Sequence, residues 1–198
     1  YKDNNLWLST FKDNFWQVPI KLPKTINIAK YQRHACFSPN GKTIYFSSNS
    51  KKGNGGYDLY YSESDGAGNW GAPKNLGATI NSKGDEDSPF ITKDGKRLYF
   101  SSKGHPGFGG YDVFYCDWED TAWSAPINAG RPFNSPDDDI YFMISNDQNE
   151  TAFLSSSRKG GEGLMDIYYF YKYGQPGFHE CTKPALAITS VDSTMEGF

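Results

Sequence analysis

The chain has 198 residues and a formal net charge of −3, and aromatic side chains make up 17% of it. A chain of this length can bury a core of its own, and its 21 glycines and 11 prolines favour many short strands joined by tight turns. The slightly acidic balance argues against a nucleic-acid-binding surface, and no apolar run is long enough for a transmembrane segment.

The N-terminal segment carries what the sequence predicts to be the end of a repeating unit. NLWLS, which starts at Asn5, stands where later units have a strand that contains Asp. FWQVPIKLPKTIN, which starts at Phe15, is a partial copy of segments found further along the chain. We therefore expect residues 1–30 to belong to a partial first unit.

Two nearly identical stretches follow. GKTIYFSSNSKKGNGGYDLYYSE begins at Gly41, and GKRLYFSSKGHPGFGGYDVFYCD begins at Gly95, 54 residues later. In the first unit, HACFS, TIYFSS, YDLYYSE and WGAPKNL alternate with turn segments, one of which contains the hairpin signal Asn-Gly. The second unit has the same order, with KDGK at the hairpin. Each unit therefore predicts four short antiparallel strands.

A third unit departs from this pattern. It keeps AFLSSS and GLMDIYY, but SNDQNE replaces the hairpin glycine and no Trp-x-x-Pro segment follows. We therefore expect the last unit to stop at its third strand. The residues after it contain Gly174, Pro176 and Gly177 and then an alternating stretch. They predict either a C-terminal tail or the start of a following β domain, over residues 174–198.

Four strands repeated at this period predict an all-β fold, a β-propeller of four-stranded antiparallel blades over residues 1–173. About three and a half blades lie in the chain: a partial first blade at 1–30, and blades at about 31–84, 85–137 and 138–173. Because propellers have four to eight blades, we expect this chain to be the C-terminal part of a larger propeller.

Two sets of recurring residues have a predicted structural role. One aspartate follows each glycine-rich loop, where its carboxylate is expected to accept hydrogen bonds from loop amides: Asp58, Asp112 and Asp166. A catalytic group would be needed only once, so recurrence favours structure. One tryptophan precedes a proline by three residues in each fourth strand and is expected to pack between blades: Trp16, Trp70 and Trp123. Ligand stacking is the alternative for the tryptophans.

The connections between units vary more, and we expect them to converge near the propeller axis with the glycine-rich loops. They contain Arg33 and His34 in the first, Asp85, Glu86 and Asp87 in the second, and Asp137, Asp138 and Asp139 in the third. His105 and Phe108 lie on a loop of the same face. The functional hypothesis is an acidic partner-binding rim. The alternative is that one acid per connection caps a turn and the others are solvated.

Catalytic and metal-binding motifs were not found. The chain has no GxSxG, GxxxxGK[ST] or HExxH motif, its three histidines have no metal-ligand spacing, and the acidic connections lack the spacing of a calcium-binding loop. Cys36, Cys116 and Cys181 also lack metal-ligand spacing, and the first two are expected to be buried thiols. We therefore predict no enzyme activity, no cofactor and no metal.

The repeated residues also carry a family resemblance. FSPNGKTIYFSSNS, GGYDLYYSE and the following W-x-x-P-x-N-L-G and INS-x-x-DE residues resemble the PD40 or TolB-type, WD40-like propeller repeat, over residues 5–171. This longer form is similar to the propellers of Bacteroidetes OmpA-family envelope proteins, such as the PorE-like components of type IX secretion.

The resemblance implies a non-catalytic scaffold in the periplasm, associated with the outer membrane. Its expected partners are other envelope or secretion-system proteins, and peptidoglycan through a separate domain. Two alternatives remain open. The propeller could gate a prolyl-oligopeptidase-like hydrolase, or it could bind glycans or muropeptides itself.

Overall fold

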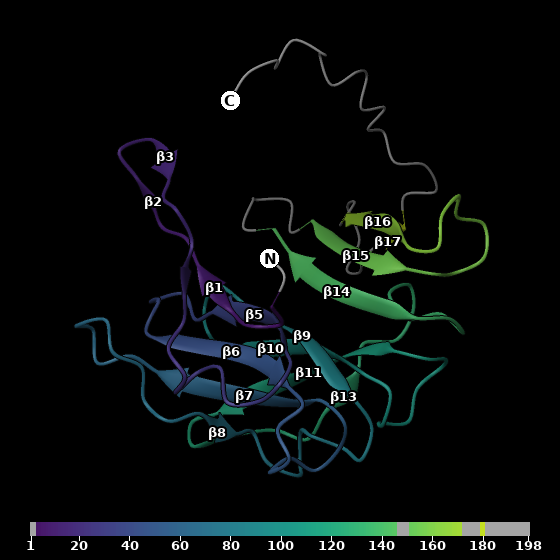
Figure 1. The fold of residues 1–198 in the computed structure, drawn as a ribbon. Coiled ribbons are helices and arrows are strands. Elements are labelled where there is room, and N and C mark those ends of the chain that lie inside the picture. The colour runs from purple at the N-terminus through teal and green to yellow at the C-terminus, as the bar shows by residue number, and fades with distance from the viewer. Residues whose placement is uncertain (1–2, 146–150, 172–178, 181–198) are drawn as a thin grey trace.

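The computed structural model describes residues 3–145, 151–171 and 179–180, and every regular element in these ranges is a β-strand (Figure 1). The part of the chain that it describes contains no helix long and apolar enough to cross a membrane. The predicted all-β class is therefore confirmed.

Three antiparallel sheets follow one another along the chain, each formed by consecutive strands. The first sheet consists of β5 (Gln32–Phe37), β6 (Thr43–Ser48), β7 (Asp58–Glu63) and β8 (Lys74–Asn75). The second consists of β9 (Glu86–Ile91), β10 (Arg97–Ser102), β11 (Asp112–Glu119), β12 (Ala122–Trp123) and β13 (Ile127–Asn128). The third consists of β14 (Asp139–Ile144), β15 (Ala152–Ser156), β16 (Asp166–Tyr171) and β17 (His179–Glu180).

The last sheet gains a strand that the sequence did not predict. His179 and Glu180 pair with Tyr171 and Phe170, so β17 supplies a fourth strand to a sheet that was expected to stop at its third. These two residues belong to the segment predicted as a tail or new domain. The rest of that prediction, residues 174–178 and 181–198, lies outside the described residues.

The N-terminal segment forms the outer strands of a further unit. β1 (Trp7–Leu8) pairs with β4 (Ile20–Lys21), and β2 (Phe11–Lys12) pairs with β3 (Phe15–Trp16). The second sheet contains the same two pairings, because β11 pairs with β13 and then with β12. In Figure 1 the β2–β3 hairpin extends away from the three larger sheets.

The core lies in layers between neighbouring units. The layer between the N-terminal strands and the first sheet contains Leu22, Ile26, Ile44, Phe46 and Tyr60. The layer between the first and second sheets contains Leu59, Ile80, Phe100, Phe114 and Cys116. The layer between the second and third contains Tyr99, Val113, Phe133, Phe142, Ala152, Leu154 and Phe170. Each sheet therefore buries a face against its neighbour, and hydrophobic burial holds the units together.

The first strands of the second and third sheets also contact the preceding sheet. β9 lies against β5, β6 and β7, and β14 lies against β9, β10 and β11. Successive antiparallel sheets of four or five strands that meet through their first strands are compatible with a β-propeller.

The recurring tryptophans have different environments. Trp70 packs against the first core layer and Trp123 against the second, and Trp123 also contacts Tyr45 of the neighbouring sheet with ring centroids 6.4 Å apart. Trp16 is 73% exposed. Among the described residues Trp16 contacts Phe11 of its own hairpin and no neighbouring sheet covers it, so its packing between blades stays a prediction.

Candidate functional site

The glycine-rich loops and the connections between units, which contain the predicted site residues, lie together at one end of the sheets. The β6–β7, β10–β11 and β15–β16 loops lie beside the connections that lead into β5, β9 and β14. Backbone hydrogen bonds join each pair: Asn49 N donates to Tyr31 O at 3.2 Å, Lys103 N to Asp85 O at 3.0 Å, and Ser157 N to Asp138 O at 3.0 Å. We call this end the glycine-loop face; it comprises residues 49–57, 103–111 and 157–165 and the connections 22–31, 76–85 and 129–138.

The recurring aspartates fasten these loops. Asp58 accepts hydrogen bonds from the amide of Asn54 at 2.5 Å and that of Gly55 at 3.0 Å. Asp112 accepts from the amides of Phe108 and Gly109 at 2.8 and 3.1 Å. In the third sheet, Asp166 accepts from Gly163 N at 3.2 Å. These carboxylates satisfy loop amides that have no strand partner.

The glycine pairs allow a close approach between loop and connection. A Cβ atom on Gly55 would lie 2.0 Å from the carbonyl oxygen of Gly84, and one on Gly109 would lie 2.3 Å from that of Pro136. Gly163, at the equivalent place in the third sheet, has no neighbour closer than 3.6 Å. The departure from the Gly-Gly-Tyr-Asp pattern therefore coincides with an open junction.

One acid of each connection bonds to the preceding unit. The carboxylate of Asp85 accepts from Tyr57 N at 2.9 Å, and that of Asp138 accepts from Tyr111 N at 2.8 Å. Asp138 also lies 3.8 Å from Lys103 Nζ. Both side chains are half-buried. Asp85 and Asp138 thus join units at the glycine-loop face, which agrees with a structural role for one acid in each acidic connection. The other part of that alternative, that the remaining acids are solvated, is wrong for Glu86, Asp87 and Asp139, which are buried.

Glu86 and Asp139 do not lie on an accessible rim, and that expectation is wrong. Both are fully buried at the start of the first strands β9 and β14. Glu86 accepts from the hydroxyls of Ser82 and Ser102, and Asp139 accepts from Ser135 N at 2.6 Å and Arg158 Nη2 at 2.9 Å. Burial raises the pKa of Glu86 and outweighs the lowering effect of these hydroxyls.

A cluster of charged and aromatic side chains forms where the first strands meet. Asp87 of β9 accepts a hydrogen bond from Arg33 Nη1 at 3.0 Å, and its other oxygen lies 2.7 Å from His34 Nδ1. The Arg33 guanidinium lies over the Tyr57 ring, 3.5 Å from its centroid. The rings of His34 and Tyr141 of β14 are in T-shaped contact, with centroids 4.5 Å apart. We call Arg33, His34, Tyr57, Asp87 and Tyr141 the junction cluster.

The junction cluster combines a buried anion with accessible groups. Asp87 is 4% exposed, while the side chains of Arg33 and His34 are 37% and 36% exposed. Burial alone would raise the pKa of Asp87, but hydrogen bonds from His34, Ser88 and Arg33 lower it below its ordinary value. Asp87 therefore holds Arg33 and His34 in place rather than facing a partner itself.

A local backbone feature directs the Tyr141 side chain. Tyr141 has φ of 58° at an irregularity in the β14–β15 pairing, and Ser88 has φ of 52° at the matching place in the β9–β10 pairing. Such left-handed residues are typical of β-bulges, which re-aim side chains. Tyr141 is 41% exposed, and burial raises the pKa of its phenol.

The other predicted rim residues, His105, Phe108 and Asp137, differ in how far they are exposed. His105 turns inward: its Nε2 atom lies 2.7 Å from Ile80 O, and its ring packs against Phe114. The expectation that His105 forms a contact platform is therefore wrong. Phe108 is 52% exposed on its loop, and Asp137 is half-buried.

The sequence analysis missed three asparagines that recur with the connections. Asn81 accepts from Leu59 N and donates to Leu59 O, and Asn134 forms the same pair of bonds with Val113. Asn27 does so with Leu6. Each amide side chain thus pairs with strand three of the preceding unit as another strand residue would. The repeated "IN" and "FN" pairs were the available signal.

The described residues contain no cluster of three or more His, Cys, Asp or Glu side chains that could hold a metal ion. Comparison with known proteins gave no matching family model and no matching curated protein.

Proposed function

We propose that the chain is part of a β-propeller that binds other proteins without catalysis, as a scaffold in a bacterial envelope assembly. The fold supports the propeller, because consecutive antiparallel sheets of four or five strands pack face to face, and the first strands of the second and third sheets contact the preceding sheet. The envelope and secretion context is supported by the resemblance of the repeated sequence. We place it in the periplasm at the outer membrane.

The junction cluster is the observation that carries the binding function. It brings together side chains from β5 and β9, with Tyr57 and Tyr141, and leaves Arg33, His34 and Tyr141 accessible. Tyr and Arg side chains held rigidly at a surface are typical of the central residues of protein interfaces. Phe108 is exposed on the β10–β11 loop of the glycine-loop face, and we include it in the proposed binding surface.

The test is partner capture by the native protein from its own envelope fraction. The variant combines Tyr141→Asn, which keeps a residue suited to a positive φ, with Phe108→Ser on the loop. The control combines Lys93→Ala and Lys96→Ala, two exposed residues at the opposite end of the β9–β10 pair. We expect the first variant to capture at least tenfold less partner than the unmodified protein, and the control to capture the same amount. Equal capture by both would overturn the proposal.

A further inference from the structure

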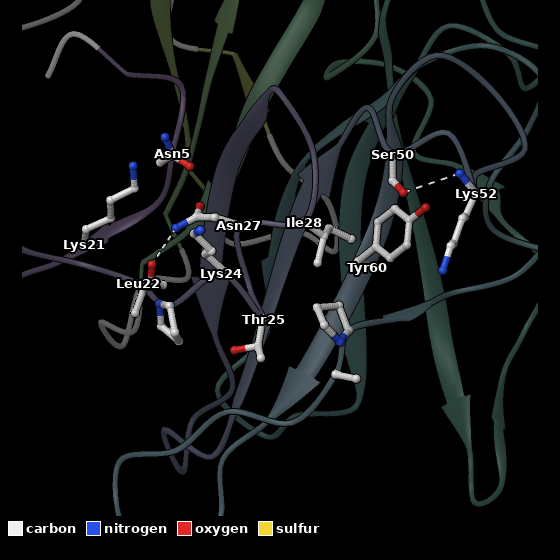
Figure 2. A pocket seen from close by; sticks show the side chains of 13 residues that line it. Asn5, Lys21, Leu22, Lys24, Thr25, Asn27, Ile28, Ser50, Lys52 and Tyr60 are labelled. Atoms are coloured by element: carbon white, nitrogen blue, oxygen red, sulfur yellow. Dashed lines mark hydrogen bonds between the residues drawn. The ribbon is translucent and has the colours of Figure 1, made fainter.

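An open pocket of about 980 Å³ lies between the N-terminal strands and the first sheet. Its walls come from the segment 21–28, the β6–β7 loop and the residues before β8 (Figure 2). This volume is within the range of small-molecule sites, and none of the junction cluster residues lines it. The pocket is therefore separate from the proposed protein-binding surface.

The charged groups of the pocket are all positive. Lys21, Lys24 and Lys52 line it, and the described lining residues include no Asp or Glu. Lys21 pairs with Asp3 at 2.7 Å, whereas Lys24 and Lys52 have no carboxylate partner within the described ranges. Two unpaired ammonium groups around one cavity favour an anionic occupant.

A buried hydroxyl supports the same conclusion. Tyr60 is 3% exposed, and its ring stacks on Phe46 beneath the pocket. Among the described residues, no group forms a hydrogen bond with the Tyr60 hydroxyl. Figure 2 shows this hydroxyl directed toward Ser50 and Lys52. A buried donor without a partner is unfavourable, so a ligand acceptor at this side of the pocket would satisfy it.

The other two sheets close the equivalent junction with a basic side chain. His105 bonds to Ile80 O in the second sheet, and Arg158 Nη2 donates to Phe133 O in the third. Before the first sheet, Ile26 is the residue equivalent to Ile80 and Phe133. The residue of the first sheet equivalent to His105 is Lys51, which is exposed. The residue equivalent to Tyr60 is Phe114 in the second sheet and Tyr168 in the third, where Arg158 lies over the Tyr168 ring. The first junction thus combines this hydroxyl with the absence of a closing side chain.

We infer that this pocket binds a small organic anion, a carboxylate or a phosphate ester with an apolar body. Its acidic group accepts hydrogen bonds from the Tyr60 hydroxyl and Ser50 and lies near Lys52. Lys24, across the pocket, adds to the positive potential. The apolar body lies against Ile28 and Pro73, which also line the pocket.

Fluorine NMR titration of the native full-length protein tests this inference. The probes are 4-fluorobenzoate and 4-fluorophenyl phosphate, with the neutral 4-fluorobenzamide as a control of the same shape. We expect at least one charged probe to bind about tenfold more tightly than the amide. The ratio between the two charged probes distinguishes a carboxylate site from a phosphate site.

The variants locate the binding. Tyr60→Phe copies the residue of the second sheet and should fold normally, and Lys52 is exposed, so Lys52→Gln should as well. Each should weaken the charged probe about fivefold to tenfold, whereas Lys51→Gln on the same loop should not. Lys51→His, which restores the closing residue, should also reduce binding. Failure of both charged probes to bind, or binding that Tyr60→Phe and Lys52→Gln leave unchanged, would overturn the inference.

Discussion

At the residue scale, short polar side chains replace missing backbone partners. Asp112 is 1% exposed and accepts from two loop amides, while Asn134 pairs with both backbone groups of Val113. Buried backbone groups must be paired, and the loop that enters β11 has no strand beside it to provide partners. These side chains are therefore part of the fold in each unit, rather than a binding site.

Replacing Asp112 with alanine should destabilise the protein, because it leaves the amides of Phe108 and Gly109 without acceptors. The expected loss is about 1–3 kcal/mol in total, because the two loop amides lose a buried, charged acceptor. Thermal and urea unfolding measure it. Asp166→Ala is the matched comparison: Asp166 is less buried and has one such amide bond, so its loss should be smaller. An unchanged melting temperature for Asp112→Ala would show that these bonds contribute little.

At the scale of elements, the glycine-rich loops allow neighbouring units to come together. Gly55 and Gly109 leave no room for a side chain against the connection of the next unit, and the amide of Gly56 donates to Gly84 O at 3.0 Å. The closeness of loop and connection then brings Asp85 within reach of Tyr57 N. Packing between units therefore requires glycine at these loop positions.

Gly109→Ala should be strongly destabilising, because its methyl group would overlap the backbone of Pro136. Overpacking of this kind typically costs about 1–3 kcal/mol, and backbone atoms have less freedom to move than a side chain. Gly71→Ala is the control, because its new Cβ would lie 3.4 Å from the nearest atom, Glu63 O. Urea unfolding of both variants would test the difference, and equal stabilities would contradict the proposed close packing.

At the scale of the whole molecule, stability comes from layers between sheets, and the first layer has an uncovered neighbour. Phe11, Phe15 and Trp16 of the β2–β3 hairpin are 59%, 69% and 73% exposed. The equivalent hairpin of the second sheet, β11–β12, carries Trp123 packed against a core layer. In the second sheet the preceding sheet covers the equivalent hairpin, because Trp123 contacts Tyr45 of β6; none of the described sheets covers the β2–β3 hairpin in this way.

Hydrogen exchange of the native protein tests whether a preceding sheet covers these strands. If a larger propeller includes them, amides of residues 7–21 should be protected to a similar degree as those of the equivalent residues 114–128 in the same molecule. Exchange orders of magnitude faster in residues 7–21 would contradict the expectation of further blades.

Much of this architecture could be predicted from the repeated sequence, because hairpin turns, strand patterns and loop glycines depend on residues close together in the chain. The paired strands and the loops on one face follow from TIYFSS, GGYD and the Asn-Gly turn. The acidic connections could not be interpreted in this way. Asp85, Glu86 and Asp87 are adjacent in sequence, yet Asp85 bonds to a loop amide, Glu86 is fully buried, and Asp87 contacts both Arg33 and His34.

The repeat in the chain was enough to specify the strands, their order and the carboxylates beside the glycine loops, since these are local consequences of backbone geometry. The surroundings of Glu86, Asp87 and Tyr60 depended on the folded molecule alone. Ser102, which bonds to Glu86, lies on another strand, and Arg33, which bonds to Asp87, lies in another unit. The pocket that Tyr60 lines is formed by residues from two units. Burial and charge pairing result from contacts between distant segments, so only packing decides which acids are hidden and which cavity stays open.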